Sequence, residues 1–142
     1  MKAKVSIFGV SGYTGTQLVS ILLNHKKIEL DAVFGRKSAG MSLSSIFPYN
    51  LNVPEKKIID YENYNFKNCD LVFSCLPHGI SQKVLNKIDP NKIIDLSADY
   101  RFDDVKTYEM TYNEKHFLET KNNEFVYGLP EINRDLIKKS NY

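Results

Sequence analysis

The stretch that decides the fold is KVSIFGVSGYTG, which runs from Lys4 to Gly15. It begins as a short apolar strand and continues into a turn in which Gly9, Gly12 and Gly15 recur every third residue. Glycine lets the turn tighten, and it lets the backbone approach a bound group closely. The amides that open the next helix point toward an anion, which the helix dipole also favours. The stretch therefore predicts a dinucleotide pyrophosphate site, with Ser11 where G-x-G-x-x-G has its middle glycine; a purely structural turn is the alternative.

Length and composition indicate one soluble domain spanning residues 1–142. The 142 residues are 42% hydrophobic and 25% charged, and the formal net charge is only +2. No basic block argues for nucleic acid, no apolar run is long enough to span a bilayer, and the first strand leaves no room for a leader peptide. Cys69 and Cys75 lie close together without a disulfide or metal pattern. We therefore expect a cytoplasmic protein with no nucleic-acid or membrane partner.

Apolar runs alternate with helical spacing along the first 100 residues. The run over 70–76 is almost continuously apolar, as is typical of a strand buried on both faces, and 92–96 is a second such run. The predicted strands are 3–9, 29–34, 70–76 and 92–96, and the predicted helices are 13–24 and 80–88. This order predicts the α/β class, with a doubly wound, mostly parallel sheet and helices on both faces.

The remaining segments carry weaker patterns. Residues 36–49 form a Ser- and Gly-rich loop, and 57–60 is a candidate for a short strand. Residues 100–120 are polar and rich in aromatic side chains, without a clear period. We expect a strand-like piece over 124–127 and a final helix over 134–139 with Asn133 as its cap.

The end of the second strand indicates which dinucleotide is bound. NAD sites usually place an acidic residue there to hold the ribose hydroxyls, whereas this strand ends in Gly35-Arg36-Lys37-Ser38. An arginine, a lysine and a hydroxyl suit a 2′-phosphate, and Asp31 lies too early in the strand to bind the ribose. We therefore predict NADP(H) as the cofactor; a solvated basic loop is the alternative.

Four motifs carry a resemblance to a known family. They are, in chain order, GVSGYTG (Gly9–Gly15), LPHG (Leu76–Gly79), DLSADYR (Asp95–Arg101) and YGLPE (Tyr127–Glu131). In this order they closely resemble the N-acetyl-γ-glutamyl-phosphate reductases, NADPH enzymes of arginine biosynthesis in the semialdehyde dehydrogenase superfamily. The resemblance runs along essentially the whole chain. It implies a Rossmann-type domain followed by a separate catalytic and dimerisation domain, a small-molecule acyl phosphate as substrate, and a homo-oligomeric intact enzyme.

The resemblance also implies how the intact enzyme reacts. A cysteine thiolate attacks the acyl phosphate, phosphate leaves, and the thioester accepts hydride from NADPH to give N-acetylglutamate semialdehyde. In the family this cysteine lies in an Asn-Pro-Gly-Cys-Tyr-Pro motif, which is expected beyond Tyr142. We therefore expect this chain alone to bind cofactor without catalysing the reaction. A non-catalytic NADP-binding module, or a reductase of aminoadipyl or aspartyl phosphate, remains as an alternative.

The candidate site residues follow from the motifs and from the basic loop. For the cofactor they are Gly9, Ser11, Gly12, Tyr13, Thr14, Gly15, Arg36, Ser38, Leu76, Pro77, His78 and Gly79; for the substrate they are Ser97 and Arg101. His78 either contacts the cofactor or is only a turn residue. Arg101 either holds a phosphate by paired hydrogen bonds or forms an ion pair with Asp99, Asp103, Asp104 or Glu131.

Three further side chains could suggest chemistry. Cys75 ends a buried strand three residues before His78, so a thiol–imidazole pair is conceivable, although a lone cysteine in an apolar run is usually a core residue. A metal site made of Cys69, Cys75 and His78 would have unusual spacing and would lack a fourth ligand, so we expect no metal. His116 is expected to be a surface residue or a loop anchor.

Overall fold

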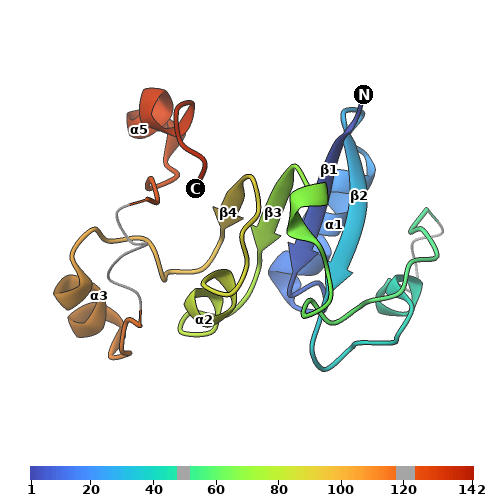
Figure 1. Cartoon of the computed structure of the whole chain (residues 1–142), viewed down its shortest axis with the longest axis horizontal. Helices are drawn as coiled ribbons and strands as arrows, with labels where there is room; N and C mark the ends of the chain where they lie inside the picture. Colours follow the sequence, from blue (N-terminus) through green and yellow to red (C-terminus); the bar gives the residue numbers. More distant parts are fainter. Residues whose placement is uncertain (48–51, 118–123) are drawn as a thin grey trace.

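The computed structural model describes residues 1–47, 52–117 and 124–142 (Figure 1). The strands are β1 (Ala3–Phe8), β2 (Ile28–Phe34), β3 (Leu71–Ser74) and β4 (Ile93–Asp95). The helices are α1 (Tyr13–Leu23), α2 (Ser81–Leu85), α3 (Val105–Tyr112) and α5 (Pro130–Ile137), with 3-10 turns η1 (Leu43–Ile46) and η2 (Phe66–Asn68). No helix within these ranges is long and apolar enough to cross a bilayer.

The four strands form one parallel sheet in the order β2-β1-β3-β4, as the alternation of strands and helices predicts. The central strand β1 pairs with β2 on one side and with β3 on the other, so Val5 lies between Leu30 and Leu71. The segment 57–60 contributes single bridges, Phe34 to Ile59 and Ser42 to Lys57, in place of the expected short strand.

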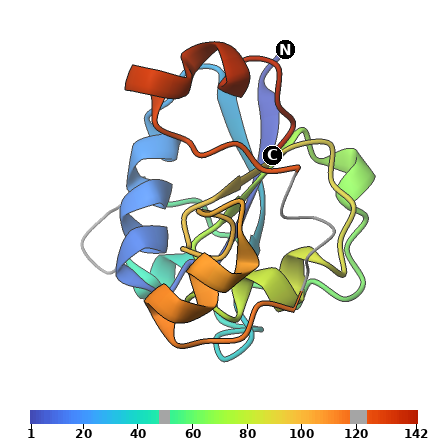
Figure 2. The same cartoon turned by 90° about the vertical axis from the view of Figure 1, so that its left-hand side faces the viewer.

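Alternate residues of the strands face two separate apolar layers. One layer lies under α1 and contains Val5, Ile7 and Val33; the other lies under η2 and α2 and contains Phe34 and Val72. Figure 2 shows the sheet between α1 on one side and η2 and α2 on the other. Helices on both faces are therefore confirmed, and this arrangement hides a parallel sheet from water.

The fourth strand is less buried than its apolar sequence predicts. Ile93 is buried beneath the α2 layer, but Ile94 is 42% exposed and Leu96 is 46% exposed. Helix α1 packs on the β1–β2 half of the sheet and leaves this face of β4 open. The expectation of a strand buried on both faces is thus wrong for 92–96. At the outer edge of β4, the Ile93 amide donates to the Asn141 carbonyl at 2.9 Å.

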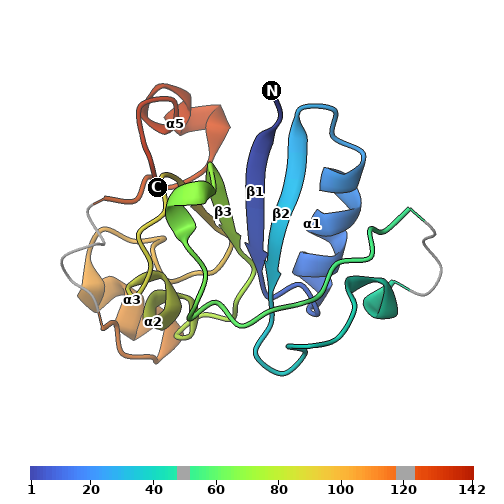
Figure 3. The same cartoon turned by 45° about the vertical axis from the view of Figure 1, so that its right-hand side comes forward.

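The second half of the chain differs most from expectation. Helix α3 lies in the stretch where no regular element was expected, and its N-cap Asp104 accepts from the Thr107 amide at 2.9 Å. Helix α2 ends at Leu85, earlier than predicted, and residues 124–127 form no strand. In Figure 3, α5 lies at the opposite end of the sheet from α2 and α3.

Helix α5 begins four residues before the predicted start, with Pro130 at its first position. Proline suits that position because it needs no hydrogen bond from its nitrogen. Asn133 is inside the helix at a kink (φ −113°, ψ 17°) and donates to the Tyr127 carbonyl at 2.9 Å, so its predicted role as the cap is wrong. Glu131 lies in the exposed first turn, and Arg134 is an exposed charge of the last turn.

Candidate functional site

Every predicted site residue lies in a loop or first helical turn that follows a strand of the sheet. The glycine turn follows β1, Arg36 and Ser38 follow β2, 76–79 follows β3, and Ser97 and Arg101 follow β4. Because the strands are parallel, these four segments meet at one edge of the sheet. In open α/β sheets this carboxyl edge is where ligands bind.

The glycine turn is packed so tightly that side chains cannot replace two of its glycines. Gly9 has φ +75°, and a Cβ there would lie 2.6 Å from the Cys75 carbonyl oxygen of the neighbouring strand end. A Cβ on Gly15 would overlap the Gly9 carbonyl oxygen and lie 2.8 Å from its carbonyl carbon. The turn therefore brings the start of α1 directly against the ends of β1 and β3.

The N-terminus of α1 faces outward without a side chain over it. Its N-cap is Gly12, which has no side chain to accept from the first-turn amides. Ser11, Tyr13 and Thr14 are exposed, and Tyr13 is 98% exposed. The free amides and the dipole of this helix of 11 residues make the turn a suitable cradle for a phosphate group.

The loop after β2 combines a cation with an unsatisfied hydroxyl. Arg36 is exposed, whereas Ser38 is buried and its Oγ has no hydrogen-bond partner in the described parts of the chain. A Cβ on Gly35 would overlap this Oγ, so the glycine leaves room for it. A buried hydroxyl without a partner is costly, and a phosphate oxygen would satisfy it.

Asp31 is engaged elsewhere, as its position inside β2 suggests. Its carboxylate accepts a hydrogen bond from the Tyr64 hydroxyl, and its backbone carbonyl accepts from Lys56 Nζ at 2.6 Å. Burial, together with this carboxylate, raises the pKa of the Tyr64 hydroxyl. Asp31 is thus part of the packing between β2 and the 61–66 segment rather than a free acid at the sheet edge.

The turn after β3 presents His78 to solvent and folds back through Gly79. Gly79 is buried with φ +73°, a conformation that favours glycine. The His78 ring is exposed and lies 5.9 Å from the Tyr112 ring, centroid to centroid. Leu76 is half-buried and Pro77 is exposed, so the turn offers a mixed surface beside the glycine turn.

A buried carboxylate holds this turn in place, and the sequence patterns did not indicate it. Asp99 is fully buried and accepts from the Gly79 amide at 2.7 Å, the Gln82 amide at 2.8 Å and the Tyr108 hydroxyl at 2.7 Å. The His116 Nε2 donates to the Asp99 carbonyl at 2.8 Å. We call Asp99, Gln82, Tyr108 and His116 the Asp99 cluster. His116 is therefore a buried loop anchor rather than a surface residue.

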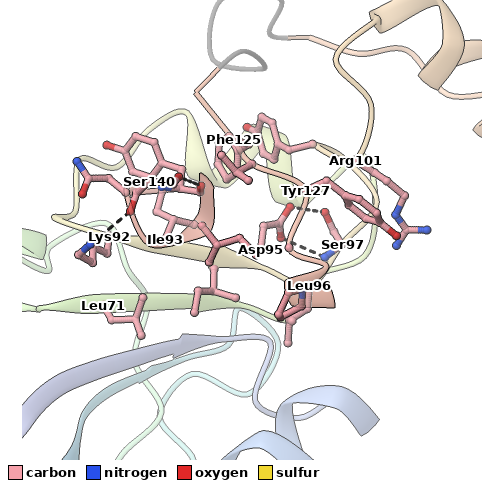
Figure 4. Close-up of a pocket in the computed structure, with 18 residues that line it drawn as sticks. Leu71, Lys92, Ile93, Asp95, Leu96, Ser97, Arg101, Phe125, Tyr127 and Ser140 are labelled. Carbon is pink, nitrogen blue, oxygen red and sulfur yellow. Dashed lines mark hydrogen bonds between the residues drawn. The ribbon is translucent and has the colours of Figure 1, made fainter. Parts of the chain in front are cut away.

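Ser97 and Arg101 line one pocket of about 560 Å³ beside β4 (Figure 4). Ser97 Oγ donates to Asp95 Oδ2 at 2.5 Å, and Ser81 Oγ donates to Asp95 Oδ1 at 2.8 Å. Burial raises the pKa of the Asp95 carboxyl, and these hydrogen bonds partly offset the rise. The pocket brings the two substrate candidates together, but Ser97 is oriented by Asp95.

Arg101 is exposed at this pocket, and its Nη1 donates to the Tyr112 hydroxyl at 3.0 Å. Of its predicted carboxylate partners, Asp99 is occupied by its own cluster, and Asp104 caps α3 through Lys106 and Thr107. The bond to Tyr112 uses one of the five N–H donors of the guanidinium. Its role in binding phosphate stays a prediction.

Tyr100 also lines this pocket, although the sequence did not single it out as functional. Its ring stacks on Phe125 with centroids 3.8 Å apart, and its buried hydroxyl has no partner in the described segments. Burial, with Asp95 and Asp99 nearby, raises the pKa of this hydroxyl. Tyr100 consequently packs the pocket wall and keeps its proton.

The two cysteines are structural. Cys69 is buried and donates to the Leu71 carbonyl at 3.0 Å, and half-buried Cys75 packs in the α1 layer. Burial, with a smaller contribution from Asp95, raises the pKa of the Cys75 thiol to about 11, so it is a poor nucleophile at neutral pH. Within the described residues, no three His, Cys, Asp or Glu side chains gather as metal ligands would.

Comparison with known proteins agrees with the motif analysis. The sequence profile of the family described as "Semialdehyde dehydrogenase, NAD binding domain" matches residues 4–140. The N-acetyl-gamma-glutamyl-phosphate reductase of Methanococcus vannielii is 44% identical, with 96% of this chain and 40% of that protein aligned. The protein of the same name from Halothermothrix orenii is 41% identical, with the same two shares. The chain thus spans about 40% of the length of these relatives.

Solved structures support the same fold. Aspartate semialdehyde dehydrogenase II from Vibrio cholerae superposes with a TM-score of 0.67 at 15% identity, covering 98% of this chain and 35% of that one. Aspartate semialdehyde dehydrogenase from Candida albicans, crystallised with NADP, gives 0.60 at 16% identity, covering 82% of this chain and 40% of that one.

Proposed function

Because this chain belongs to the family of semialdehyde dehydrogenase NAD-binding domains, we propose that it is the NADP(H)-binding portion of an N-acetyl-γ-glutamyl-phosphate reductase. The observation that carries the proposal is the carboxyl edge of the sheet. There the open N-terminus of α1 and the unsatisfied Ser38 hydroxyl lie in the loops after two neighbouring strands. The identity of 44% with a curated enzyme of that name supports this substrate class over the aminoadipyl and aspartyl alternatives.

The residues present fit a dinucleotide phosphate. The first-turn amides of α1 would hold the pyrophosphate, since Gly12 places no side chain over the helix start and Gly9 and Gly15 let the turn close tightly beneath it. Arg36 and Ser38 would hold the 2′-phosphate: the guanidinium supplies charge and the orphan hydroxyl supplies a donor. Asp31 is bound to Tyr64, and Glu29 lies at the start of β2, so this strand places neither of its carboxylates at its carboxyl end to hold an unphosphorylated ribose; NADP is therefore favoured over NAD.

The turn 76–79 and the loop 97–101 would bracket the reacting end of the cofactor, which supplies a hydride when bound. His78, exposed on that turn, would contact the nicotinamide half. Arg101 would bind the acyl phosphate of N-acetylglutamyl phosphate, and Ser97 would add a polar contact. The thiolate that the reaction needs would come from the portion of the enzyme that this chain does not cover, so this chain alone is expected to be inactive.

The setting of the intact enzyme follows from the same proposal. We expect it in the cytoplasm, because both cysteines are free thiols and a reducing compartment keeps them so. We expect a homo-oligomer whose contacts lie in the catalytic portion.

Calorimetric titration of the chain with NADPH and NADH tests the cofactor assignment. We expect NADPH to bind at least about tenfold more tightly than NADH, because a charged hydrogen-bonded phosphate contributes about 1.5–3 kcal/mol. Arg36→Ala should remove most of that preference while leaving NADH binding unchanged. Arg134→Ala, which removes an exposed arginine on α5, is the matched control. Equal binding of both nucleotides, or binding of neither, would overturn the assignment.

A further inference from the structure

Asp99 is a buried carboxylate that joins two of the candidate site loops. It lies in the chain between Ser97 and Arg101, and its side chain reaches across to the turn after β3. Both carboxylate oxygens are used there: Oδ1 accepts from Gly79 and Tyr108, and Oδ2 accepts from Gln82.

Two of these donors are backbone amides, which cannot become acceptors. A neutral side chain of the same shape would place an NH₂ group against either the Gly79 or the Gln82 amide. The Tyr108 hydroxyl could rotate to accept from that group, but a backbone N–H could not. The site therefore requires an acceptor at both side-chain oxygens, and the complete burial of Asp99 makes a lost hydrogen bond costly.

The position of the His78 turn depends on this carboxylate. Gly79 has φ +73°, so the turn needs an external contact to select this conformation, and Asp99 supplies it through the Gly79 amide. The Tyr108 hydroxyl, which donates to the same Asp99 carboxylate, connects the turn to α3. Gln82 connects the turn to the segment after α3, because its Oε1 accepts from the Phe117 amide at 2.7 Å. The turn is thus fixed through the buried side chains of Asp99, Gln82 and Tyr108.

We propose that Asp99 is a positioning residue that sets the His78 turn against the Ser97–Arg101 loop, and so fixes where the nicotinamide half of the cofactor is held. The proposal rests on the proposed NADP(H) function. Asp99 is buried and acts through Gly79 and Gln82 rather than by touching the ligand. Its effect should therefore be confined to the part of the nucleotide near this turn. The adenosine 2′-phosphate half, bound at the glycine turn and at Arg36, should be indifferent to it.

Two nucleotides separate this role from a general effect on stability. NADPH occupies both halves of the site, whereas 2′,5′-ADP occupies only the glycine turn and the 2′-phosphate loop. In Asp99→Asn we expect NADPH to bind about tenfold more weakly and 2′,5′-ADP to change by less than about twofold. Tyr108→Phe removes one donor and keeps the aromatic packing, so we expect about a threefold loss for NADPH alone.

Asp31→Asn is the matched control, because it neutralises a hydrogen-bonded carboxylate of the same sheet away from the His78 turn. We expect it to bind both nucleotides as the unmodified chain does. A selective loss of NADPH in Asp31→Asn, or an equal loss of both nucleotides in Asp99→Asn and Tyr108→Phe, would overturn the positioning role. If Asp99→Asn does not fold, Tyr108→Phe decides the question alone.

Amide hydrogen exchange tests the positioning without any nucleotide. We expect the Gly79 and Gln82 amides to exchange at least about tenfold faster in Asp99→Asn, and to a smaller extent in Tyr108→Phe, while amides of β1 stay unchanged. Unchanged exchange at both amides would overturn the proposal. Should the unmodified chain bind neither NADPH nor 2′,5′-ADP, the proposed function would fail, and the exchange result would still report separately whether Asp99 fixes the turn.

Discussion

The glycine turn and the Asp99 cluster lie at the same edge of the sheet, but they are built in opposite ways. The turn between β1 and α1 uses backbone only: its shape depends on missing side chains at Gly9 and Gly15. The turn after β3 is held by the Asp99 side chain, which accepts from the Gly79 and Gln82 amides and from the Tyr108 hydroxyl of α3. The comparison teaches that a loop at the carboxyl edge can be fixed in two ways: by glycines that allow close backbone packing, or by a buried carboxylate that accepts from the amides of the loop.

The two designs leave different surfaces for a ligand. The glycine turn exposes its own amides, which suits a group such as pyrophosphate that every dinucleotide carries. In the Asp99 cluster the Gly79 and Gln82 amides are hydrogen-bonded to Asp99 and are not available to a ligand, whereas the His78 side chain is exposed. Recognition at the second turn therefore depends on side-chain placement, and substitutions should affect the two regions differently.

The largest effect is expected from adding one methyl group to the backbone-built turn. In Gly15→Ala the Cβ would overlap the Gly9 carbonyl, a backbone atom that cannot move aside, so the free energy of unfolding should fall by about 3 kcal/mol or more. Urea unfolding measures it. Gly128→Ala is the control, since nothing lies within 4 Å of a Cβ there. A Gly15→Ala protein as stable as its control would show that the turn tolerates side chains.

A smaller loss is expected from the side-chain-built region. Gln82→Leu keeps the volume but leaves the Phe117 amide and the Lys115 carbonyl without their partner, which should lower the free energy of unfolding by about 2 kcal/mol. Gln17→Leu, at an exposed position of α1, is the comparison. Equal stability of the two variants would mean that the side chain of Gln82 does not anchor the segment after α3.

Asp95→Asn should be close to neutral, which sharpens the contrast with Asp99. The donor to Asp95 Oδ2 is the Ser97 hydroxyl, which can turn and accept from an amide, while the asparagine oxygen can keep the bonds of Oδ1 from the Ser81 hydroxyl and the Ser97 amide. We therefore expect a change within about 1 kcal/mol at pH 7. Because burial raises the native pKa of Asp95, the folded chain binds more protons than the unfolded chain between the two pKa values. The stability of the unmodified chain relative to Asp95→Asn is therefore greatest in acid and declines as the pH rises through the native pKa.

Urea unfolding at pH 4 and pH 7 checks this sign, with Asp135→Asn on exposed α5 as the control for the lost charge. A relative stability that rises with pH would contradict the burial argument.

The smallest effect is expected outside both regions. Lys67 and Asp89 form an ion pair at 2.5 Å, but their side chains are 60% and 76% exposed. Lys67→Ala should change the free energy of unfolding by about 0.5 kcal/mol or less, since solvent screens exposed pairs. Thermal unfolding at low and high salt measures this; a loss as large as that of Gln82→Leu would show that the 67–89 contact is structural.

The contrast also explains what could be read from the sequence. The strands and the glycine turn depend on neighbouring residues, so apolar runs and the spacing of Gly9, Gly12 and Gly15 were enough to predict them. The four motifs, taken in their order along the chain, added the family resemblance. Helix α3 was missed because its sequence has no apolar stripe: Tyr108 is its one buried residue, and the Tyr108 hydroxyl donates to Asp99.

The rest depends on contacts between distant residues. The Asp99 carboxylate bonds to groups 17 and 20 residues earlier in the chain, a pairing that no local pattern encodes. The exposure of Ile94 follows from how far α1 extends over the sheet, which the sequence of β4 does not contain. Arg101 lies beyond the carboxyl end of β4, as the sequence predicts, but its hydrogen bond with Tyr112 could not be predicted without α3.

The strand order β2-β1-β3-β4 has a consequence for how the chain acquires its structure. Val5 of β1 pairs with Leu71 of β3, which is synthesised 66 residues later. Until then β1 can pair only with β2, and its other edge stays without a partner strand. When β3 docks on β1 it brings the Cys75 carbonyl against Gly9, so the carboxyl edge that carries the candidate site forms only at that point. Non-local pairing of this kind is slow compared with helix formation. The arrival of β3 is therefore the step at which a nascent chain turns from a βαβ unit into a nucleotide-binding fold.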